Sequence, residues 1–299
     1  RLRKESGESA VLMIAPPGSG EDIAPFIKIA RHLHSIGLGA PRILASNRSE
    51  GFLLLEDFGD ALFARVAERD PALEGTLYQA AADVLLDLQK TGMPESVPAY
   101  DETALAEAAM LSIEWYAPAG TDGTDLAKRI AEVVAALDDL TDVLALRDYH
   151  AENLIWLPDR PDIRRVGLLD FQDAMAGHPT YDLVSLLQDA RRDVSPDVAA
   201  KTMTHVLNRS GREAEAFERA YATLGAQRNL RILGVFARLC LRDEKASYLT
   251  LIPRVWGHLQ TALSHPRLDA LGREVGRCLP PPSPKHLADL EARCGQMRQ

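Results

Sequence analysis

Cysteine is scarce in this chain, whose 299 residues include only Cys240, Cys278 and Cys294. Three cysteines at such wide spacing suit neither a disulfide framework nor a zinc knuckle, and they fit a reducing compartment, for which the cytoplasm is the default. The sequence also has no apolar run long enough to span a bilayer and no signal peptide at its start. It therefore predicts a cytoplasmic protein without a membrane partner.

Long runs of positive charge are missing as well. The formal net charge is -9, and basic residues are scattered or paired, as in Arg164 and Arg165. Nucleic-acid binding depends on clustered Lys and Arg side chains that displace counterions from the phosphates. We therefore expect no nucleic-acid partner.

The most informative polar residues lie in and just after the segment 147–153. Asp148 is followed five residues later by Asn153, and Asp170 stands at the end of the next apolar run. Phosphoryl transfer needs a carboxylate beside the attacking hydroxyl, and an amide and a second carboxylate on the metal ion. The spacing predicts that Asp148 is the catalytic carboxylate and that Asn153 and Asp170 bind Mg²⁺, which prefers oxygen ligands.

A predicted β-hairpin would bring these groups together. The apolar segments 154–157 and 166–169 are separated by residues 158–162, whose Pro and Asp content is typical of a turn. An Asp and an Asn at this spacing also occur by chance in acidic chains, but polar residues at both ends of two apolar strands favour the phosphotransferase interpretation. A zinc deaminase, suggested by His150 and Glu152, would need a downstream pair of cysteines that the sequence lacks.

The segments 146–153, 169–173 and 177–183 together resemble the aminoglycoside phosphotransferase and choline kinase group of kinase-like enzymes. Within that group, the first two segments are similar to the anomeric kinases of N-acetylmuramate and N-acetylglucosamine, which act in peptidoglycan recycling. The resemblance runs from about Ala10 to Trp256. It implies an α+β, bilobal protein-kinase-like fold and an ATP-dependent phosphotransferase whose acceptor is the alcohol group of a small-molecule sugar.

The resemblance also implies a domain order. Residues 1–57 would form a small β-rich N-lobe that binds nucleotide and is truncated at its start. Residues 58–279 would form a large, mainly helical C-lobe with the catalytic loop and the metal hairpin, and residues 280–299 a Pro-rich linker and tail. Arg1 rather than Met begins the sequence, so we expect further residues upstream.

Apolar periodicity predicts the elements of these lobes. In the N-lobe we expect strands at 10–14, 38–44 and 52–55 and one helix at 23–36. In the C-lobe we expect helices, besides the hairpin, at 76–88, 103–115, 125–140, 182–190, 196–207, 213–241 and 255–263. No internal repeat is present.

Binding residues follow from the resemblance as well. The resemblance implies a hinge between the two lobes, whose backbone groups would bind the adenine of ATP. The predicted hinge residues are Leu55, Glu56, Asp57 and Phe58. An ordinary strand-to-helix turn would have the same composition. The predicted substrate-binding residues are Tyr149, His150, Glu152, Gln172, Asp173 and Arg191. Arg191 would bind a carboxylate on the sugar, or it is a solvated helix end. Asp182 would hold the catalytic loop through hydrogen bonds.

Two departures from the kinase pattern leave alternatives open. Met13 stands where kinases carry a phosphate-binding Lys, and no Gly-rich loop is present in the sequence. Arg3, Lys4, Lys28 or an upstream residue would have to replace that Lys. The protein could be a nucleotide-binding pseudokinase, which would explain Met13. Asp148, Asn153 and Asp170 would then have no evident function. The acceptor could also be an aminoglycoside, choline or an amino acid, and the oligomeric state stays open.

Overall fold

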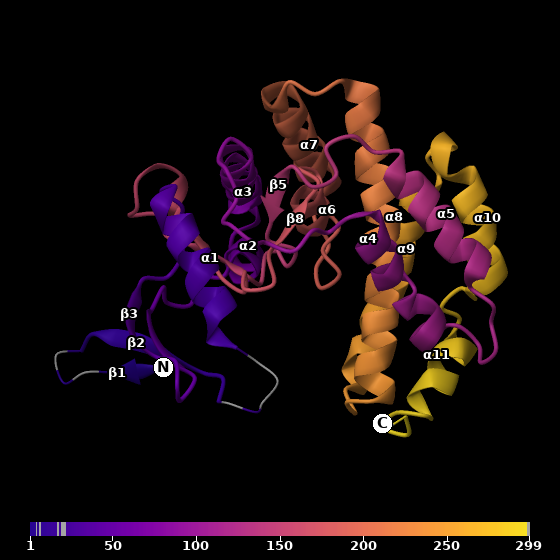
Figure 1. Ribbon diagram of the computed structural model, residues 1–299, viewed down its shortest axis with the longest axis horizontal. Coiled ribbons are helices and arrows are strands. Elements are labelled where there is room, and N and C mark those ends of the chain that lie inside the picture. Colours follow the sequence, from indigo (N-terminus) through magenta and orange to yellow (C-terminus); the bar gives the residue numbers. More distant parts are fainter. Residues whose placement is uncertain (4, 6, 17, 19–21, 298–299) are drawn as a thin grey trace. The chain divides into compact units, whose positions relative to one another are not determined.

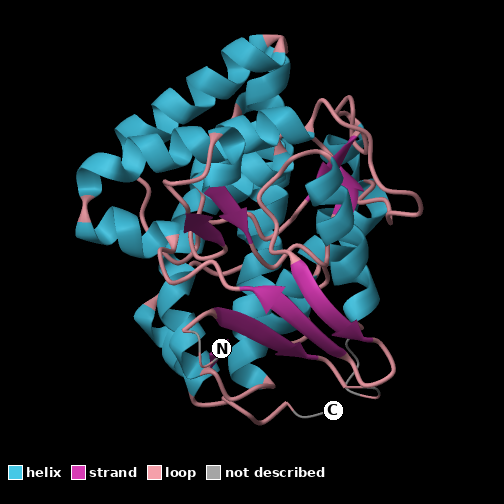
Figure 2. Cartoon of the chain, turned by 90° about the vertical axis from the view of Figure 1, so that its left-hand side faces the viewer, coloured by secondary structure: helices cyan, strands magenta, loops and turns pink. Residues whose placement is uncertain are grey.

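The chain divides into two compact units. The computed structural model describes residues 1–3, 5, 7–16, 18 and 22–297. Unit 1 comprises residues 1–98, 143–187 and 195–210, and unit 2 comprises residues 99–142, 188–194 and 211–299. Figure 2 shows that helices make up most of the chain and that the strands form short sheets. The predicted N-lobe, C-lobe and tail, with boundaries at residues 57 and 279, were defined by expected function, whereas these units are defined by contacts. That three-part division stays a prediction.

Unit 1 begins with a four-stranded antiparallel sheet in the order β1-β2-β4-β3. Its strands are β1 (Leu2–Arg3), β2 (Ser9–Ile14), β3 (Ile43–Asn47) and β4 (Phe52–Glu56). Helix α1 (Ile23–Ser35) separates β2 from β3 along the chain (Figure 1). The helix begins where the Asp22 carboxylate accepts the backbone N–H of Ala24, and its apolar face is buried.

The expected strand at 38–44 is wrong in its bounds. Strand β3 begins only at Ile43, because the residues before it pair with another part of unit 1. Gly39 forms a bridge with Gly167, and its carbonyl oxygen accepts the backbone N–H of Leu168 at 2.8 Å. A Cβ atom on Gly39 would lie 2.4 Å from the Val166 carbonyl oxygen, so this approach requires glycine.

The rest of unit 1 combines two small sheets with four helices. The helices are α2 (Phe63–Arg69), α3 (Glu74–Leu88), α6 (Tyr181–Leu187) and α7 (Pro196–Ser210). The two-stranded sheets pair β5 (Val143–Ala145) with β8 (Met175–Gly177) and β6 (Leu154–Trp156) with β7 (Val166–Leu168). The second pair confirms the predicted hairpin, because Leu154 lies opposite Leu168 in an antiparallel register.

Unit 2 is built around one long, largely buried helix, α8, against which α4, α9 and α11 pack (Figure 1). Its helices are α4 (Glu102–Ala109), a π-helical turn (Ser112–Tyr116), α5 (Thr124–Ala135), α8 (Ala214–Leu241), α9 (Ile252–Leu263), α10 (Asp269–Cys278) and α11 (Pro284–Glu291). The sequence did not predict α10 and α11. The Pro-rich segment is an ordered part of unit 2, because the Tyr116 hydroxyl donates to the Pro280 carbonyl at 2.9 Å and Leu290 is buried.

Candidate active site

Residues 146–153, which we call the catalytic loop because they carry the predicted catalytic residue Asp148, are held in place by α6. The buried Asp182 carboxylate accepts the backbone N–H groups of Leu146 at 2.6 Å and Arg147 at 2.8 Å. The Ser185 hydroxyl donates to the Arg147 carbonyl at 3.2 Å. Arg147 has φ 70°, a left-handed conformation that costs free energy and persists only where the surroundings hold it. The predicted structural role of Asp182 is confirmed.

The Asn153 side chain links the predicted catalytic and metal-binding residues. Its Nδ2 atom donates to the Asp148 carbonyl at 2.9 Å and to Asp170 Oδ2 at 3.2 Å. The backbone also links these segments, since the N–H of Leu169, the residue before Asp170, donates to the Asn153 carbonyl at 3.0 Å. Asp148, Asn153 and Asp170, which are separated by up to 22 positions in sequence, therefore lie in one network within unit 1.

Asp170 lies just after β7, at the open end of the hairpin, in a restrained conformation. Its φ of 56° turns the chain sharply, and its Oδ1 atom accepts the Gln172 side chain at 2.7 Å. The next residue, Phe171, is fully buried and stacks on Phe26 of α1 with ring centroids 4.7 Å apart. Because Phe171 is anchored, the exposed Asp170 carboxylate keeps a defined position.

The donor atoms present here suit a hard divalent cation. With Asn153 Nδ2 directed at Asp148 and Asp170, the amide oxygen of Asn153 is left to act as a ligand beside the Asp170 carboxylate. Within the described ranges, no group of three or more His, Cys, Asp or Glu residues could hold a metal ion. A site with two protein ligands completed by phosphate oxygens and water is how Mg²⁺-type ions bind in nucleotide enzymes.

The predicted substrate-binding residues lie in different surroundings. His150 is buried, with Nε2 3.4 Å from Asn153 Nδ2, and Gln172 contacts Asp170. Glu152 and Asp173 are exposed, and the Asp173 carbonyl accepts Arg147 Nη1 at 3.1 Å. His150 and Gln172 therefore contact the network, and Glu152 adjoins Asn153 in sequence.

Tyr149 and Arg191 have other surroundings. The Tyr149 ring is buried, and its hydroxyl donates to the Ala81 carbonyl of α3 at 2.9 Å. Burial, together with the charges of Asp182 and Asp83, raises the pKa of Tyr149 well above its ordinary value. This side chain holds the loop against α3. Arg191 belongs to unit 2, where its backbone N–H donates to the Asp189 carboxylate at 2.8 Å.

The predicted hinge residues span the last two positions of β4 and the two residues after it, and their side chains make structural contacts. The Glu56 carboxylate accepts Arg160 Nη2 at 2.7 Å and contacts Arg42 Nε at 3.3 Å. Burial alone would raise the pKa of Glu56, but hydrogen bonds from Arg42 and the charge of Arg160 lower it below its ordinary value. The Glu56 N–H donates to the Arg42 carbonyl, so an adenine contact at Glu56 would use its carbonyl oxygen.

The neighbouring hinge residues are equally constrained. Leu55 is buried within the sheet, and the Arg160 guanidinium lies 4.7 Å from the centroid of the Phe58 ring. Asp57 pairs with Arg1 at 2.7 Å and accepts the Gly59 N–H at 2.9 Å. The side chains of this segment are therefore held by contacts within unit 1, and its role as a nucleotide-binding hinge stays a prediction.

Among the candidates that the structure describes, none evidently replaces the missing phosphate-binding Lys. Met13 pairs with Leu53 in the sheet and is half-buried. Lys28 donates to the Ser96 carbonyl at 3.0 Å, and Arg3 is exposed at the end of β1. Lys4 lies outside the described residues.

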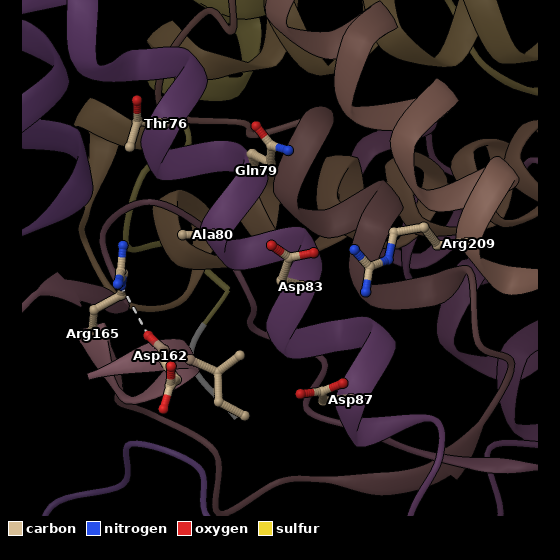
Figure 3. Close-up of a pocket in the computed structure, with 9 residues that line it drawn as sticks. Thr76, Gln79, Ala80, Asp83, Asp87, Asp162, Arg165 and Arg209 are labelled. Carbon is tan, nitrogen blue, oxygen red and sulfur yellow. Dashed lines mark hydrogen bonds between the residues drawn. The ribbon is translucent and has the colours of Figure 1, made fainter. Parts of the chain in front are cut away.

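A polar cavity of about 430 Å³ beside α3 is separate from this network. Figure 3 shows Asp83 and Asp87 of α3 and Arg209 of α7 among its walls, with Arg165 bonded to Asp162 across from them. Asp83 accepts His205 Nε2 at 2.7 Å. None of the predicted site residues lines this cavity, so it is not the candidate active site.

A carboxylate on a loop, an amide five residues later and a second carboxylate just after a hairpin are typical of a phosphotransferase of the kinase-like class. The chain belongs to the phosphotransferase enzyme family, whose sequence model matches residues 1–213. Such membership implies the use of ATP and a divalent metal ion, and the oxygen donors of Asn153 and Asp170 fit that ion.

Two named relatives cover most of the chain. The N-acetylmuramate/N-acetylglucosamine kinase of Caulobacter vibrioides is 40% identical over 272 residues, covering 85% of this chain and 74% of the relative. The enzyme of the same name from Pseudomonas aeruginosa is 35% identical, covering 91% of this chain and 82% of the relative.

Solved structures show the same fold. A choline/ethanolamine kinase family protein from Mesorhizobium loti has a TM-score of 0.62 at 15% identity and covers 96% of this chain and 88% of that one. The choline kinase of Streptococcus pneumoniae also has a TM-score of 0.62, at 13% identity, and covers 86% of this chain and 88% of that one. The predicted α+β, protein-kinase-like fold class is confirmed. In the part of the chain that is described, no helix is both long and apolar enough to cross a membrane.

Proposed function

We propose that this protein transfers the γ-phosphate of MgATP to the anomeric hydroxyl of N-acetylmuramate or N-acetylglucosamine, as a step of peptidoglycan recycling. The observation that supports it is the Asn153 amide, which is bonded to both the Asp148 backbone and the Asp170 carboxylate. This network occurs in a chain that is 40% identical to a kinase named for those two sugars. ATP is abundant in the cytoplasm, which is where we propose that the protein acts.

Asp148 is the proposed catalytic carboxylate. Its loop is held by two hydrogen bonds to Asp182, so the Asp148 side chain is positioned before substrate binds. It accepts or orients the proton of the attacking hydroxyl. An anomeric hydroxyl is more acidic than an ordinary sugar alcohol, so a positioned carboxylate suffices without a stronger base.

Asn153 and Asp170 are the proposed magnesium ligands. The bound ion would neutralise charge on the phosphates, a large part of catalysis in phosphoryl transfer. Gln172 keeps one Asp170 oxygen in a hydrogen bond, which restricts rotation of the carboxylate and leaves its position defined. The hinge at Leu55, Glu56, Asp57 and Phe58 is the proposed adenine site, through backbone groups.

His150, Glu152, Gln172 and Asp173 are the proposed sugar contacts. His150 lies beside Asn153, and the exposed Glu152 and Asp173 carboxylates are acceptors for sugar hydroxyls. Arg191 belongs to unit 2, and its predicted contact with a sugar carboxylate stays a prediction. Tyr149 is proposed as a support of the loop rather than a direct contact, because its hydroxyl is bonded to α3.

The test compares free N-acetylglucosamine with its methyl glycoside, which keeps every hydroxyl except the anomeric one. Phosphorus NMR of the products should show a sugar 1-phosphate from the free sugar and no phosphorylation of the glycoside. A phosphorylated glycoside, or a 6-phosphate from the free sugar, would overturn the anomeric assignment. Choline, an amino acid and an aminoglycoside in the same assay test the other acceptors, and rapid phosphorylation of one of them would replace the sugar.

A further inference from the structure

The fold brings together two cysteines that are far apart in sequence. Cys240 lies in the last turn of α8 and is fully buried, while Cys294 follows α11 and is partly exposed. The Cys294 thiol donates to the Cys240 carbonyl oxygen with a sulfur-to-oxygen distance of 3.1 Å. The two residues are therefore in direct contact, although 54 positions separate them.

The backbone keeps the two cysteines adjacent. The Gly295 N–H donates to the same Cys240 carbonyl at 3.0 Å, and the Met297 N–H donates to the Leu241 carbonyl at 3.1 Å. The segment after α11 thus runs along the end of α8. A disulfide requires close approach of the two main chains, and the contacts of Cys294 and Gly295 with one carbonyl oxygen bring these chains together.

The two thiols differ in reactivity. Burial, followed by a hydrogen bond with the Cys294 thiol, raises the pKa of Cys240 to about 12. Cys240 is thus a weak nucleophile near neutral pH, because only the thiolate attacks. The partly exposed Cys294 is the thiol that a small reagent can reach first.

We propose that Cys240 and Cys294 form an oxidisable thiol pair, a modification site at which a small disulfide such as oxidised glutathione fastens the segment after α11 to the end of α8. The Cys294 thiolate attacks one glutathione sulfur, the glutathione disulfide breaks, and one glutathione leaves. Cys240 then loses its proton to solvent and attacks the Cys294 sulfur, which releases the second glutathione. Two protein thiols are oxidised and one oxidised glutathione is reduced to two thiols.

Cys278 supplies an internal control. It is buried at the end of α10, and its thiol contacts the Asp122 carbonyl at 3.6 Å instead of another cysteine residue. It should therefore remain a thiol under conditions that oxidise the pair. The proposal concerns unit 2 alone and does not rest on the proposed sugar substrate.

The experiment incubates the folded protein with oxidised glutathione, blocks remaining thiols under denaturing conditions and counts them by mass spectrometry. We expect three free thiols before treatment and one afterwards, with the peptides of Cys240 and Cys294 joined. Cys278→Ser should still form the link and leave no free thiol. Cys294→Ser should prevent it and keep both remaining thiols.

Three results would overturn the proposal: three thiols that survive in the treated protein, a glutathione adduct on Cys294 that never closes, or a link that involves Cys278. The closing step adds a kinetic test. Its rate should rise from pH 7 to 9, because a higher pH raises the fraction of Cys240 present as thiolate. A pH-independent closing rate would contradict attack by Cys240. The closed loop should raise Tm by several degrees, reversed by a reductant.

Discussion

The catalytic loop of unit 1 and helix α8 of unit 2 are held in opposite ways. The loop depends on directed polar contacts, with left-handed residues Arg147 and Asp170 and the buried Asp182 carboxylate beneath. Helix α8 depends on close packing, so that Gly234 admits no side chain against the backbone of Leu111. Polar contacts fix the direction of a few atoms, whereas packing fixes the distance between whole elements.

This difference predicts which substitutions should lower activity and which should lower stability. A change to an exposed or half-buried polar atom in the loop should cost activity with little loss of fold. A change to the α8 packing should cost stability instead. Asp182 lies between these cases, because it is a polar group that is also buried.

Asp148→Asn should produce the largest effect. It keeps the shape of the side chain and removes the proton acceptor, so turnover should fall on the order of 10²- to 10⁴-fold. ATP affinity and Tm should stay close to those of the parent protein. Steady-state kinetics, ATP titration and thermal unfolding check this, with Asp159→Asn in the exposed turn as the control. Near-native turnover would remove Asp148 from its proposed role.

Asp170→Ala should weaken magnesium-dependent ATP binding roughly 10- to 100-fold, since one of two proposed protein ligands is lost. Titrating ATP with and without Mg²⁺ separates the metal contribution from the rest. Gln172→Leu, which only frees the carboxylate to rotate, should give a smaller loss. Equal affinity of Asp170→Ala and the parent in Mg²⁺ would place the metal ion elsewhere.

Asp182→Asn should affect both properties, which distinguishes it from the first two changes. The two N–H groups of Leu146 and Arg147 would lose a charged acceptor, at a cost on the order of 2–4 kcal/mol of unfolding free energy. Turnover should fall too, because Asp148 is then less well positioned. Denaturant unfolding and kinetics on the same sample measure the two losses. If only stability or only turnover fell, the support of the loop by Asp182 would not be coupled to catalysis.

The sequence predicted the proximity of the three polar residues better than the packing around them. Asp148, Asn153 and Asp170 were expected to lie together because phosphoryl transfer imposes a fixed spacing on residue types, and their catalytic and metal-binding roles stay predictions. Apolar periodicity located α8 and the hairpin. The stack of Phe26 on Phe171 gave no signal, since contacts between distant positions are set by tertiary structure.

Two other features were missed for identifiable reasons. Helix α11 follows the Pro-rich segment, where local composition indicated a linker, although Pro at the first turn also begins helices. Helix α10 follows a short 3-10 turn at Pro266–Leu268 and was not among the predicted helices. Their order comes from packing, as the buried Leu290 shows. The contact of Cys240 with Cys294 depends on that packing and could not be predicted from cysteine spacing.

Gly234→Ala should destabilise the protein by about 1–3 kcal/mol, because the new Cβ would lie 2.2 Å from the Leu111 carbonyl carbon and backbone cannot move aside cheaply. Calorimetry should show a Tm lower by roughly 2–4 °C per kcal/mol. Gly257→Ala is the matched control, a helical glycine whose Cβ would meet nothing within 4 Å. It should be neutral or stabilising. Equal Tm changes in the two variants would contradict the packing account of α8.

Glu56→Gln should give the smallest effect, visible in the pH dependence of stability. Because the folded-state pKa of Glu56 lies below its ordinary value of 4.5, its carboxylate contributes stability that is fully present above that pH. The contribution is lost as the pH falls through the lower folded-state pKa, where the pairs with Arg42 and Arg160 are neutralised. Tm of the parent should therefore drop more steeply from pH 6 to pH 3 than Tm of Glu56→Gln. Glu68→Gln, an exposed change in α2, should keep the parent slope, and a parent slope in Glu56→Gln would show that its ion pairs do not support the hinge.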